Sequence, residues 1–298
     1  MRRKKKVKKK KNNMKKITKP DCKVSDILDN CISSMYNPRK DIIKRVKDEI
    51  IKKSDEYDLL GQNGNLFTIK EHTTVLDIAY KQDMVYLYTE KFVPEKEKNY
   101  QYYSKIIGLV DICPYCQQKQ VRTLDHYLPK TKYVTYSVTP VNLIPSCSDC
   151  NKDKTNNSFS DYIHQPFHPY YDDFDETNWL KAKLIENDEI AFYFYADPAD
   201  LTDTEKAERI KYNFSKKGFA LNDIYKVYSA ETYHQEFGRI KRLYLAGGVE
   251  AAKKDIMISI ESYREDNINS WKAAMYQAII DSEWYWTNYI PRIITNVN

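Results

Sequence analysis

The chain has 298 residues, of which 42% are hydrophobic and 30% are charged, a composition that supports one large folded domain or two ordinary ones. No apolar run approaches the roughly 20 residues that cross a bilayer, and the basic start of the chain leads into polar residues instead of an apolar signal segment. We therefore expect a cytoplasmic protein. The seven glycines form neither of the common phosphate-binding loops, which argues against a nucleotide-driven motor or a dehydrogenase.

The net charge of +6 is unevenly distributed along the chain. Residues 1–19 hold 12 of the 48 Lys and Arg residues and no acidic residue, so the rest of the chain has 36 basic against 42 acidic residues. Such a run repels itself and cannot be buried, which predicts a basic disordered tail over residues 1–19. Two interpretations stay open. The tail attracts nucleic-acid phosphates, or it only aids solubility or precedes a true start at Met14.

The N-terminal region, residues 20–104, has the hydrophobic periodicity of helices. One helix is predicted over residues 37–61, where Asn and Pro open and Gly closes an apolar stripe at helical spacing. A second helix is predicted over residues 74–92. Between residues 105 and 160, short apolar runs are broken by prolines and paired cysteines, which indicates a small module of short strands and loops.

The C-terminal region, residues 161–298, is also mainly helical in pattern. Residues 190–195 alternate as a strand does, and apolar residues then return to helical spacing. Gly247 and Gly248 are expected to end one helix, and another helix is expected over residues 268–279. These elements predict an α+β protein that is mostly helical and contains a small central module.

Four of the six cysteines form two C-x2-C pairs, Cys113 with Cys116 and Cys147 with Cys150. Two such pairs supply the four thiolates of a tetrahedral structural Zn²⁺ site. A disulfide framework is the alternative, but a long chain without a secretion signal is expected to keep its thiols reduced. The 30 residues between the pairs exceed the usual spacer of roughly 15 to 20, which suggests that this loop carries further chemistry.

The spacer and the residues after it contain side chains that suit phosphodiester hydrolysis. They are TLDHYLPK at 123–130, PVNLIP at 140–145 and NKDK at 151–154. A metal-assisted phosphodiesterase needs a base to activate water, oxygen ligands for a hard cation, and cations near the phosphate. The three segments contain all of these groups close to one zinc site.

In this order and spacing, the CPYC pair, LDHYLP, and NLIPSCSDCN with its following lysine resemble the HNH or ββα-metal endonucleases. The resemblance spans about residues 113–154 and implies a zinc-stapled ββα-metal module. It implies that His126 is the general base and that Asp125 is a ligand of the catalytic cation. It also implies that Asn142 pins the loop and that Asn151 is a metal ligand where many members have His. An amide oxygen there favours Mg²⁺ or Mn²⁺ as the catalytic cation, while the four cysteines would hold a structural Zn²⁺.

A nucleic-acid partner is also favoured by local charge. Residues 101–155 contain 7 basic and 4 acidic residues within an otherwise acidic body. The lysines that could contact flanking phosphates are Lys130, Lys132, Lys152 and Lys154. The resemblance implies a nuclease, for which we expect DNA as the substrate rather than RNA.

A narrower resemblance rests on the helical leader, the motifs above and HPYYDD at 168–173. These features are similar to the HNH component of Septu and some retron anti-phage systems, which implies a defence nuclease that acts with an ATPase partner. In this segment His168 is expected to be structural, with a catalytic role as the alternative. The competing hypothesis for the whole chain is a non-catalytic, zinc-stabilised module that binds nucleic acid or protein.

Overall fold

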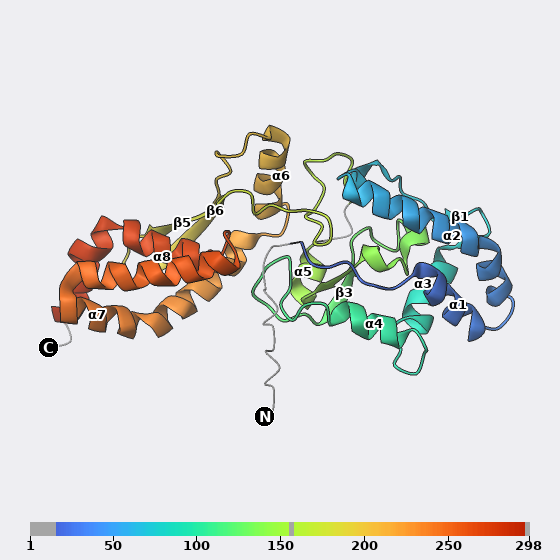
Figure 1. Cartoon of the computed structure of the whole chain (residues 1–298), viewed down its shortest axis with the longest axis horizontal. Coiled ribbons are helices and arrows are strands. Elements are labelled where there is room, and N and C mark those ends of the chain that lie inside the picture. The colour runs from blue at the N-terminus through green and yellow to red at the C-terminus, as the bar shows by residue number, and fades with distance from the viewer. Residues whose placement is uncertain (1–15, 155–157, 296–298) are drawn as a thin grey trace, which may run out of the picture. The chain divides into compact units, whose positions relative to one another are not determined.

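The structure is a computed structural model that describes residues 16–154 and 158–295 (Figure 1). The chain divides into two compact units between Asp173 and Phe174. The N-terminal helices and the cysteine-rich module share the first unit with residues 161–173, which the sequence placed in the C-terminal region. In the part of the chain that is described, no helix is long and apolar enough to cross a membrane.

The first unit begins with helices and a very short strand pair. Its elements before the cysteines are α1 (Val24–Ser33), α2 (Arg39–Gln62), β1 (Thr74–Val75), β2 (Ala79–Tyr80), α3 (Lys81–Lys91) and α4 (Tyr100–Ile107). Ile43, Val46 and Ile50 recur at helical spacing along α2 and are fully buried in the core that α2 shares with α1. The helix predicted over residues 37–61 is therefore confirmed.

The helix predicted over residues 74–92 is wrong in its first part. Residues 74–80 form the antiparallel β1–β2 pair, and α3 begins only at Lys81. Leu76 and Asp77 have φ values of 53° and 54°, in the left-handed region that an α-helix cannot contain. The main-chain N–H of Tyr80 donates to Asp83 Oδ2 at 3.1 Å, which satisfies an amide at the first turn and starts the helix here.

The small central module consists of two antiparallel strands followed by a short helix. These are β3 (Thr123–His126), β4 (Leu143–Ser146) and α5 (Ser148–Asp153), with α5 packed against β3 (Figure 1). The loop between the strands contains two 3-10 turns, η2 (Val134–Tyr136) and η3 (Pro140–Asn142). The short strands and loops predicted for this segment are confirmed.

Part of the predicted tail contacts the first unit. Residues 1–15 lie outside the described residues. Of the residues that follow, Ile17 donates its main-chain N–H to Pro169 O at 2.8 Å, and Lys19 Nζ lies 2.5 Å from Asp58 Oδ1. The described end of the predicted tail is therefore held in place, in contrast to the disorder expected through residue 19.

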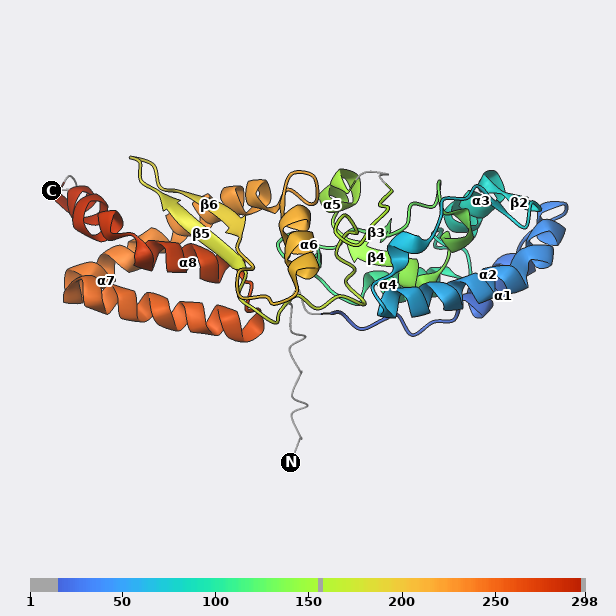
Figure 2. The same ribbon diagram turned by 90° about the horizontal axis from the view of Figure 1, so that it is seen from above.

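The second unit combines one β-hairpin with long helices. Its elements are β5 (Leu180–Ile185), β6 (Ala191–Ala196), α6 (Thr204–Phe214), α7 (Leu221–Asp266), α8 (Trp271–Asp281), the π-helical turn η4 (Tyr285–Tyr289) and α9 (Ile290–Thr295). Helices α7 and α8 pack against the hairpin (Figure 2). Gly247 and Gly248 have non-helical backbone angles and divide α7 in two, as the sequence predicts, and Gly248 has a φ of 71° that favours glycine.

Candidate active site and zinc centre

The four paired cysteines come together in space. Their sulfur atoms all lie within 4.8 Å of one another, and all four side chains are buried. Cys116 Sγ and Cys147 Sγ are 4.0 Å apart, about twice the length of a disulfide bond, and all four cysteines are free thiols. Four thiolates at these separations fit one tetrahedral Zn²⁺ with bonds of about 2.3 Å. The cluster could therefore hold zinc, and the disulfide alternative is wrong.

The backbone shapes both cysteine pairs for a common ion. In the first pair, Gln117 donates its main-chain N–H to Cys113 O at 2.8 Å and has a left-handed φ of 54°, which closes a tight turn. In the second pair, Cys147 caps α5, and its sulfur accepts the N–H of Cys150 at 3.4 Å. The cysteine cluster thus joins the loop after α4 to the first turn of α5.

Asp125 lies near the end of β3 and is held through one carboxylate oxygen. Its Oδ2 accepts hydrogen bonds from Tyr115 Oη at 3.0 Å and from Lys154 Nζ at 2.5 Å. The other oxygen, Oδ1, has no hydrogen-bond partner among the described residues. Because Tyr115 lies between Cys113 and Cys116, the loop of the first cysteine pair directly orients this carboxylate. Tyr115 was not singled out from the sequence, where it resembles an ordinary aromatic spacer.

His126 ends β3 as a neutral imidazole. Its Nε2 lies 2.9 Å from Ser137 O, and since a carbonyl only accepts, Nε2 carries the proton and Nδ1 keeps its lone pair. Burial lowers the pKa of His126 to about 3, and the ammonium groups of Lys130 and Lys154 act in the same direction. The ring also meets Tyr88 edge-on at 4.3 Å between centroids. A neutral, fixed imidazole of this kind can accept a proton through Nδ1.

Asn142 ties the loop after β3 to the rest of the site. Its Oδ1 accepts from the main-chain N–H of Leu128 at 2.7 Å and from Tyr57 Oη at 3.0 Å. Its Nδ2 donates to Leu128 O and to Tyr136 O, each at 3.1 Å. All four hydrogen bonds of a fully buried amide are therefore made within the loop and to α2. Tyr57 appears in the sequence only as part of the apolar stripe of α2.

Helix α5 and the residue that follows it carry two further predicted residues. Lys154, at the end of α5, is buried and also donates to His126 O at 2.9 Å. Asn151 is half-buried and precedes Lys154 by three residues, so the two lie on the same side of the helix. The structure thus gathers Asp125, His126 and Lys154 in direct contact and places Asn151 on the adjoining turn.

A comparison with known families matches residues 113–157 to the model of the HNH endonucleases. These residues form an HNH endonuclease domain. Over most of its length the chain is also similar to protein ea31 of Escherichia phage lambda. The two are 28% identical over 302 residues, which cover 91% of this chain and 98% of ea31. No solved structure matches the chain.

The lysines of the HNH domain have unequal freedom to meet a phosphate. Lys154 is buried in its ion pair with Asp125, so it is not the exposed cation that the sequence suggests. Lys130 is half-buried with its ammonium 5.2 Å from the Tyr88 ring centre, and burial lowers its pKa. Lys132 pairs with Glu71 at 3.1 Å. Of the four predicted contacts, Lys152 alone is exposed.

His168 packs beside the HNH domain in an aromatic environment. It is 1% exposed, and its ring lies 4.2 Å from the Tyr127 ring and 4.3 Å from the Tyr171 ring, between centroids. Its Nε2 is 3.2 Å from Tyr57 Oη, the same hydroxyl that donates to Asn142. This burial favours the structural interpretation of His168 over a catalytic one.

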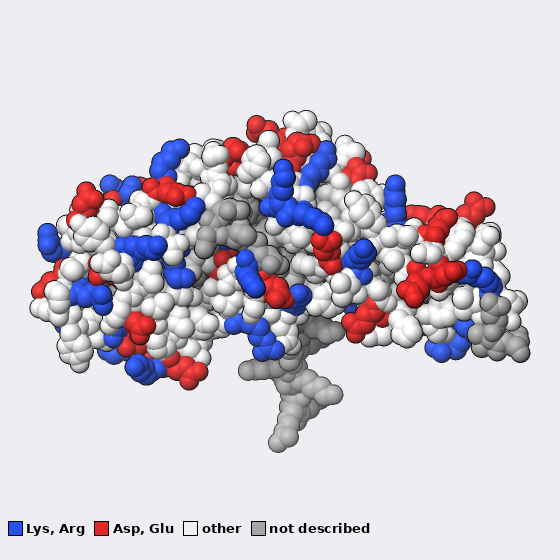
Figure 3. Space-filling model, turned by 180° about the vertical axis from the view of Figure 1, so that it is seen from behind, with Lys and Arg blue, Asp and Glu red and all other residues white. Residues whose placement is uncertain are grey.

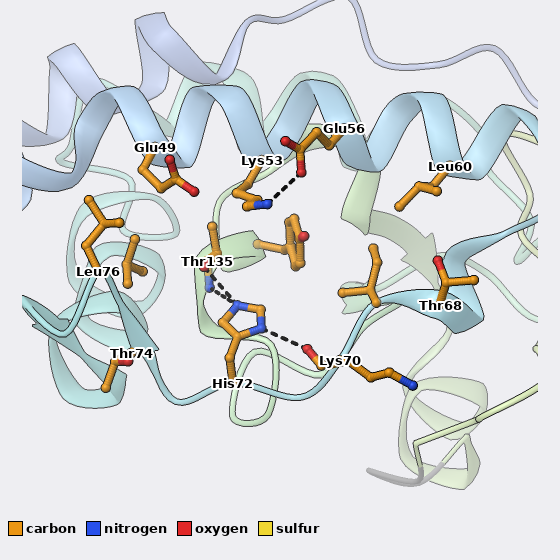
Figure 4. Close-up of a pocket in the computed structure, with 13 residues that line it drawn as sticks. Glu49, Lys53, Glu56, Leu60, Thr68, Lys70, His72, Thr74, Leu76 and Thr135 are labelled. Carbon is orange, nitrogen blue, oxygen red and sulfur yellow. Dashed lines mark hydrogen bonds and ion pairs between the residues drawn. The ribbon is translucent and has the colours of Figure 1, made fainter.

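A pocket of about 360 Å³ lies beside η2 (Figure 4). His72 lines it, with Nε2 2.8 Å from Thr135 Oγ1 and Nδ1 3.0 Å from Lys70 O. Thr135 is two residues before Ser137, whose carbonyl holds His126. The pocket therefore adjoins the backbone that positions the HNH histidine, although no sequence motif marks His72.

Proposed function

We propose that this protein is a metal-dependent HNH endonuclease that hydrolyses phosphodiester bonds of nucleic acid, with DNA rather than RNA as its substrate. The observation that carries the proposal is the convergence of Asp125 and His126 at the end of β3 with Lys154 of the α5 segment. The family match over residues 113–157 supports the same conclusion.

Asp125 and Asn151 are the residues that would hold the catalytic cation. Carboxylate and amide oxygens suit hard cations such as Mg²⁺ or Mn²⁺. Asp125 fits this role because its Oδ2 already stabilises a positive charge, the Lys154 ammonium, while Oδ1 has no partner among the described residues. When bound, such a cation would neutralise charge on the scissile phosphate and the leaving oxygen.

His126 would act as the general base toward the attacking water. The Nε2–H group donates to Ser137 O, so the lone pair of Nδ1 is the one available to receive a proton. Asn142 maintains this arrangement, because it joins Leu128, just after the histidine, to Tyr136, just before Ser137. The base is thus fixed both through its own ring and through the loop around it.

Structural zinc would stabilise the HNH domain without contacting substrate. The cysteine cluster is buried and offers four sulfur ligands, which leaves no open coordination position for catalysis. Its effect on chemistry would pass through Tyr115, which orients Asp125. The four cysteines are therefore assigned to folding and the oxygen ligands to the reaction.

Charge on the face drawn in Figure 3 does not locate the substrate. On the face drawn in Figure 3, basic and acidic side chains are interspersed. Lys152, which is exposed, and Lys130, which is half-buried beside the Tyr88 ring, are the best placed to meet phosphates near the HNH site. Each such interaction would strengthen binding without selecting a base sequence.

A role in anti-phage defence beside an ATPase partner is the narrower part of the proposal. It rests on the resemblance to Septu and retron nucleases, and the comparisons do not confirm it. Co-purification with a co-encoded ATPase would test it, with the α1–α4 and second-unit helices as the expected docking regions. A non-catalytic zinc module remains the competing hypothesis, which cleavage assays address directly.

The test of the enzyme hypothesis is cleavage of plasmid DNA and total RNA with Mg²⁺ or Mn²⁺. His126→Ala should abolish cleavage and keep both the fold and the zinc, because the imidazole is needed to accept a proton. Asn151→Ala should lose activity that excess Mn²⁺ partly restores, because one ligand of several is removed. Wild-type cleavage by His126→Ala would refute the catalytic assignment and favour the binding module.

A further inference from the structure

The two faces of the β5–β6 hairpin in the second unit differ in exposure. Phe192 and Phe194 are fully buried and meet the rings of Tyr233 and Tyr225, both on α7. Side chains alternate across a strand, so the residue between them, Tyr193, lies on the opposite face. Tyr193 is 52% exposed. The hairpin therefore presents an aromatic surface that its own unit does not bury.

The strand register adds two lysines to this surface. Lys183 is directly opposite Tyr193, and Lys181 is directly opposite Tyr195. Residues that pair directly share one face of a sheet, so the four side chains lie together. Lys183 Nζ is 5.5 Å from the centre of the Tyr195 ring. Neither lysine forms an ion pair with any carboxylate of the described chain.

The two tyrosines form an ordered platform beside a hollow. Their ring centroids are 6.2 Å apart and their planes differ by only 16°. A hollow of about 310 Å³ adjoins them, lined also by the end of α6 and the start of α7, including Lys211 and Asn222. Asn222 accepts the main-chain N–H of Phe194 at 2.9 Å, which fixes this edge of β6 against α7. The two rings thus stand on a strand that α7 supports from its other face, and Tyr193 is the more exposed of the two.

We propose that this face of β5–β6 binds single-stranded nucleic acid. Unpaired bases would stack on Tyr193 and Tyr195, and Lys181 and Lys183 would contact the phosphates between them. Every base has an aromatic face, so such a surface can bind single strands of any base sequence. A duplex hides the faces of its bases within its own stack. The inference rests on the proposed nuclease function in taking nucleic acid as the ligand, and it deepens that function by naming the form that is bound.

The test measures binding by fluorescence anisotropy in EDTA, where a metal-dependent nuclease cannot cut its probe. The probes are a labelled oligothymidylate, an oligouridylate of equal length and a DNA duplex. Changing both tyrosines to Ala should weaken binding of the single strands by about tenfold or more, as expected when stacking is removed. Changing both to Phe should preserve binding, because the rings remain. The matched control is Tyr36→Ala, since Tyr36 is an 88% exposed tyrosine of the first unit.

The lysines give an independent measurement. Changing Lys181 and Lys183 to Ala should reduce the slope of log affinity against log salt by about 0.7 for each phosphate that the protein no longer neutralises. Lys254→Ala, at an exposed lysine of α7, should leave the slope unchanged. Oligothymidylate and oligouridylate distinguish DNA from RNA as the bound strand.

Unchanged binding in the double Ala variant of the tyrosines, or a duplex bound as tightly as a single strand, would overturn the proposal. The first outcome would instead favour the exposed rings as a protein-docking surface. The proposed nuclease function is judged separately by cleavage with Mg²⁺. If the wild type does not cut nucleic acid but the double Ala variant of the tyrosines loses single-strand binding, the binding proposal stands and the nuclease proposal is refuted. If the wild type cuts but the variant binds single strands unchanged, the nuclease proposal stands and the binding proposal is refuted.

Discussion

The Lys154 ammonium lies 2.5 Å from Asp125 Oδ2 and 2.9 Å from His126 O, so one buried cation contacts both residues assigned to catalysis. Both side chains of the ion pair are 7% exposed. Burial lowers the pKa of Lys154, while the adjacent carboxylate of Asp125 acts in the opposite direction. Lys154 therefore supplies the positive charge that balances the Asp125 carboxylate when no divalent cation is near.

Lys154→Met tests this charge balance. The variant keeps an unbranched side chain of similar size but removes the cationic partner of the buried Asp125, to which only the Tyr115 hydroxyl still donates. This should lower the free energy of unfolding by about 3–5 kcal/mol. Mn²⁺ should then stabilise the variant more than the wild type, since the cation replaces the missing charge. Urea unfolding with and without Mn²⁺ measures both effects.

Lys152→Met is the matched control for that experiment. Lys152 is exposed on the same short helix, so its replacement should change stability by no more than about 0.5 kcal/mol. Equal stability of the Lys154 and Lys152 variants, each without an added response to Mn²⁺, would show that the buried pair has no role in balancing the site.

The cysteine cluster predicts one zinc ion per chain that is essential for folding of the HNH domain. Cys147→Ser should lose the metal and unfold this domain, because binding of structural zinc contributes directly to folding free energy. Elemental analysis and circular dichroism measure the two effects together. Cys22→Ser should keep its zinc, since Cys22 lies outside the cluster. Active wild-type protein without zinc would contradict the assignment.

Much of the site could be predicted because its chemistry is local in sequence. The Cys pairs need only two residues between ligands, and the sulfur cluster forms as that spacing predicts. Asp125 and His126 are neighbours at a strand end, and Asn142 precedes the second pair by a few residues. The family-specific roles of these residues stay predictions, because geometry alone does not measure catalysis.

The parts that the sequence did not predict depend on long-range packing. Tyr57 reaches Asn142 across 85 residues of chain, and no local pattern marks a hydroxyl for that hydrogen bond. The burial of Lys154 likewise requires α5 to dock on β3. The turn at Leu76 and Asp77 has a left-handed backbone but contains neither glycine nor proline. With no turn-forming residue to mark it, the apolar spacing of residues 74–80 predicted a helix instead.

Tyr57→Phe tests the buried hydrogen bond that the sequence did not reveal. The change removes the hydroxyl between Asn142 Oδ1 and His168 Nε2, which should lower stability by about 1–3 kcal/mol. The loop that carries Ser137 should loosen as well, so cleavage should fall while zinc content stays unchanged. Tyr36→Phe, at an exposed ring, is the matched control. Wild-type stability in Tyr57→Phe would show that Asn142 holds the loop without this hydroxyl.

The last prediction concerns His126 and acid. Its pKa is lowered to about 3 in the folded protein, against about 6.5 in an unfolded chain, so between these values the unfolded state binds the additional proton. The contribution of His126 to the free energy of unfolding is thus fully present above about pH 6.5. It falls by up to about 1.4 kcal/mol per pH unit as the pH drops toward 3. His126→Ala should show a shallower acid loss over this window in urea titrations, measured on metal-free protein. The neutral imidazole of His126 persists well below neutral pH, so cleavage should not decline just below pH 6.5 through protonation of this residue. A nearby divalent cation would disfavour the protonated imidazole further. Identical acid profiles for wild type and His126→Ala would show that the imidazole is not held neutral by burial, and the argument for it as a ready base would fail.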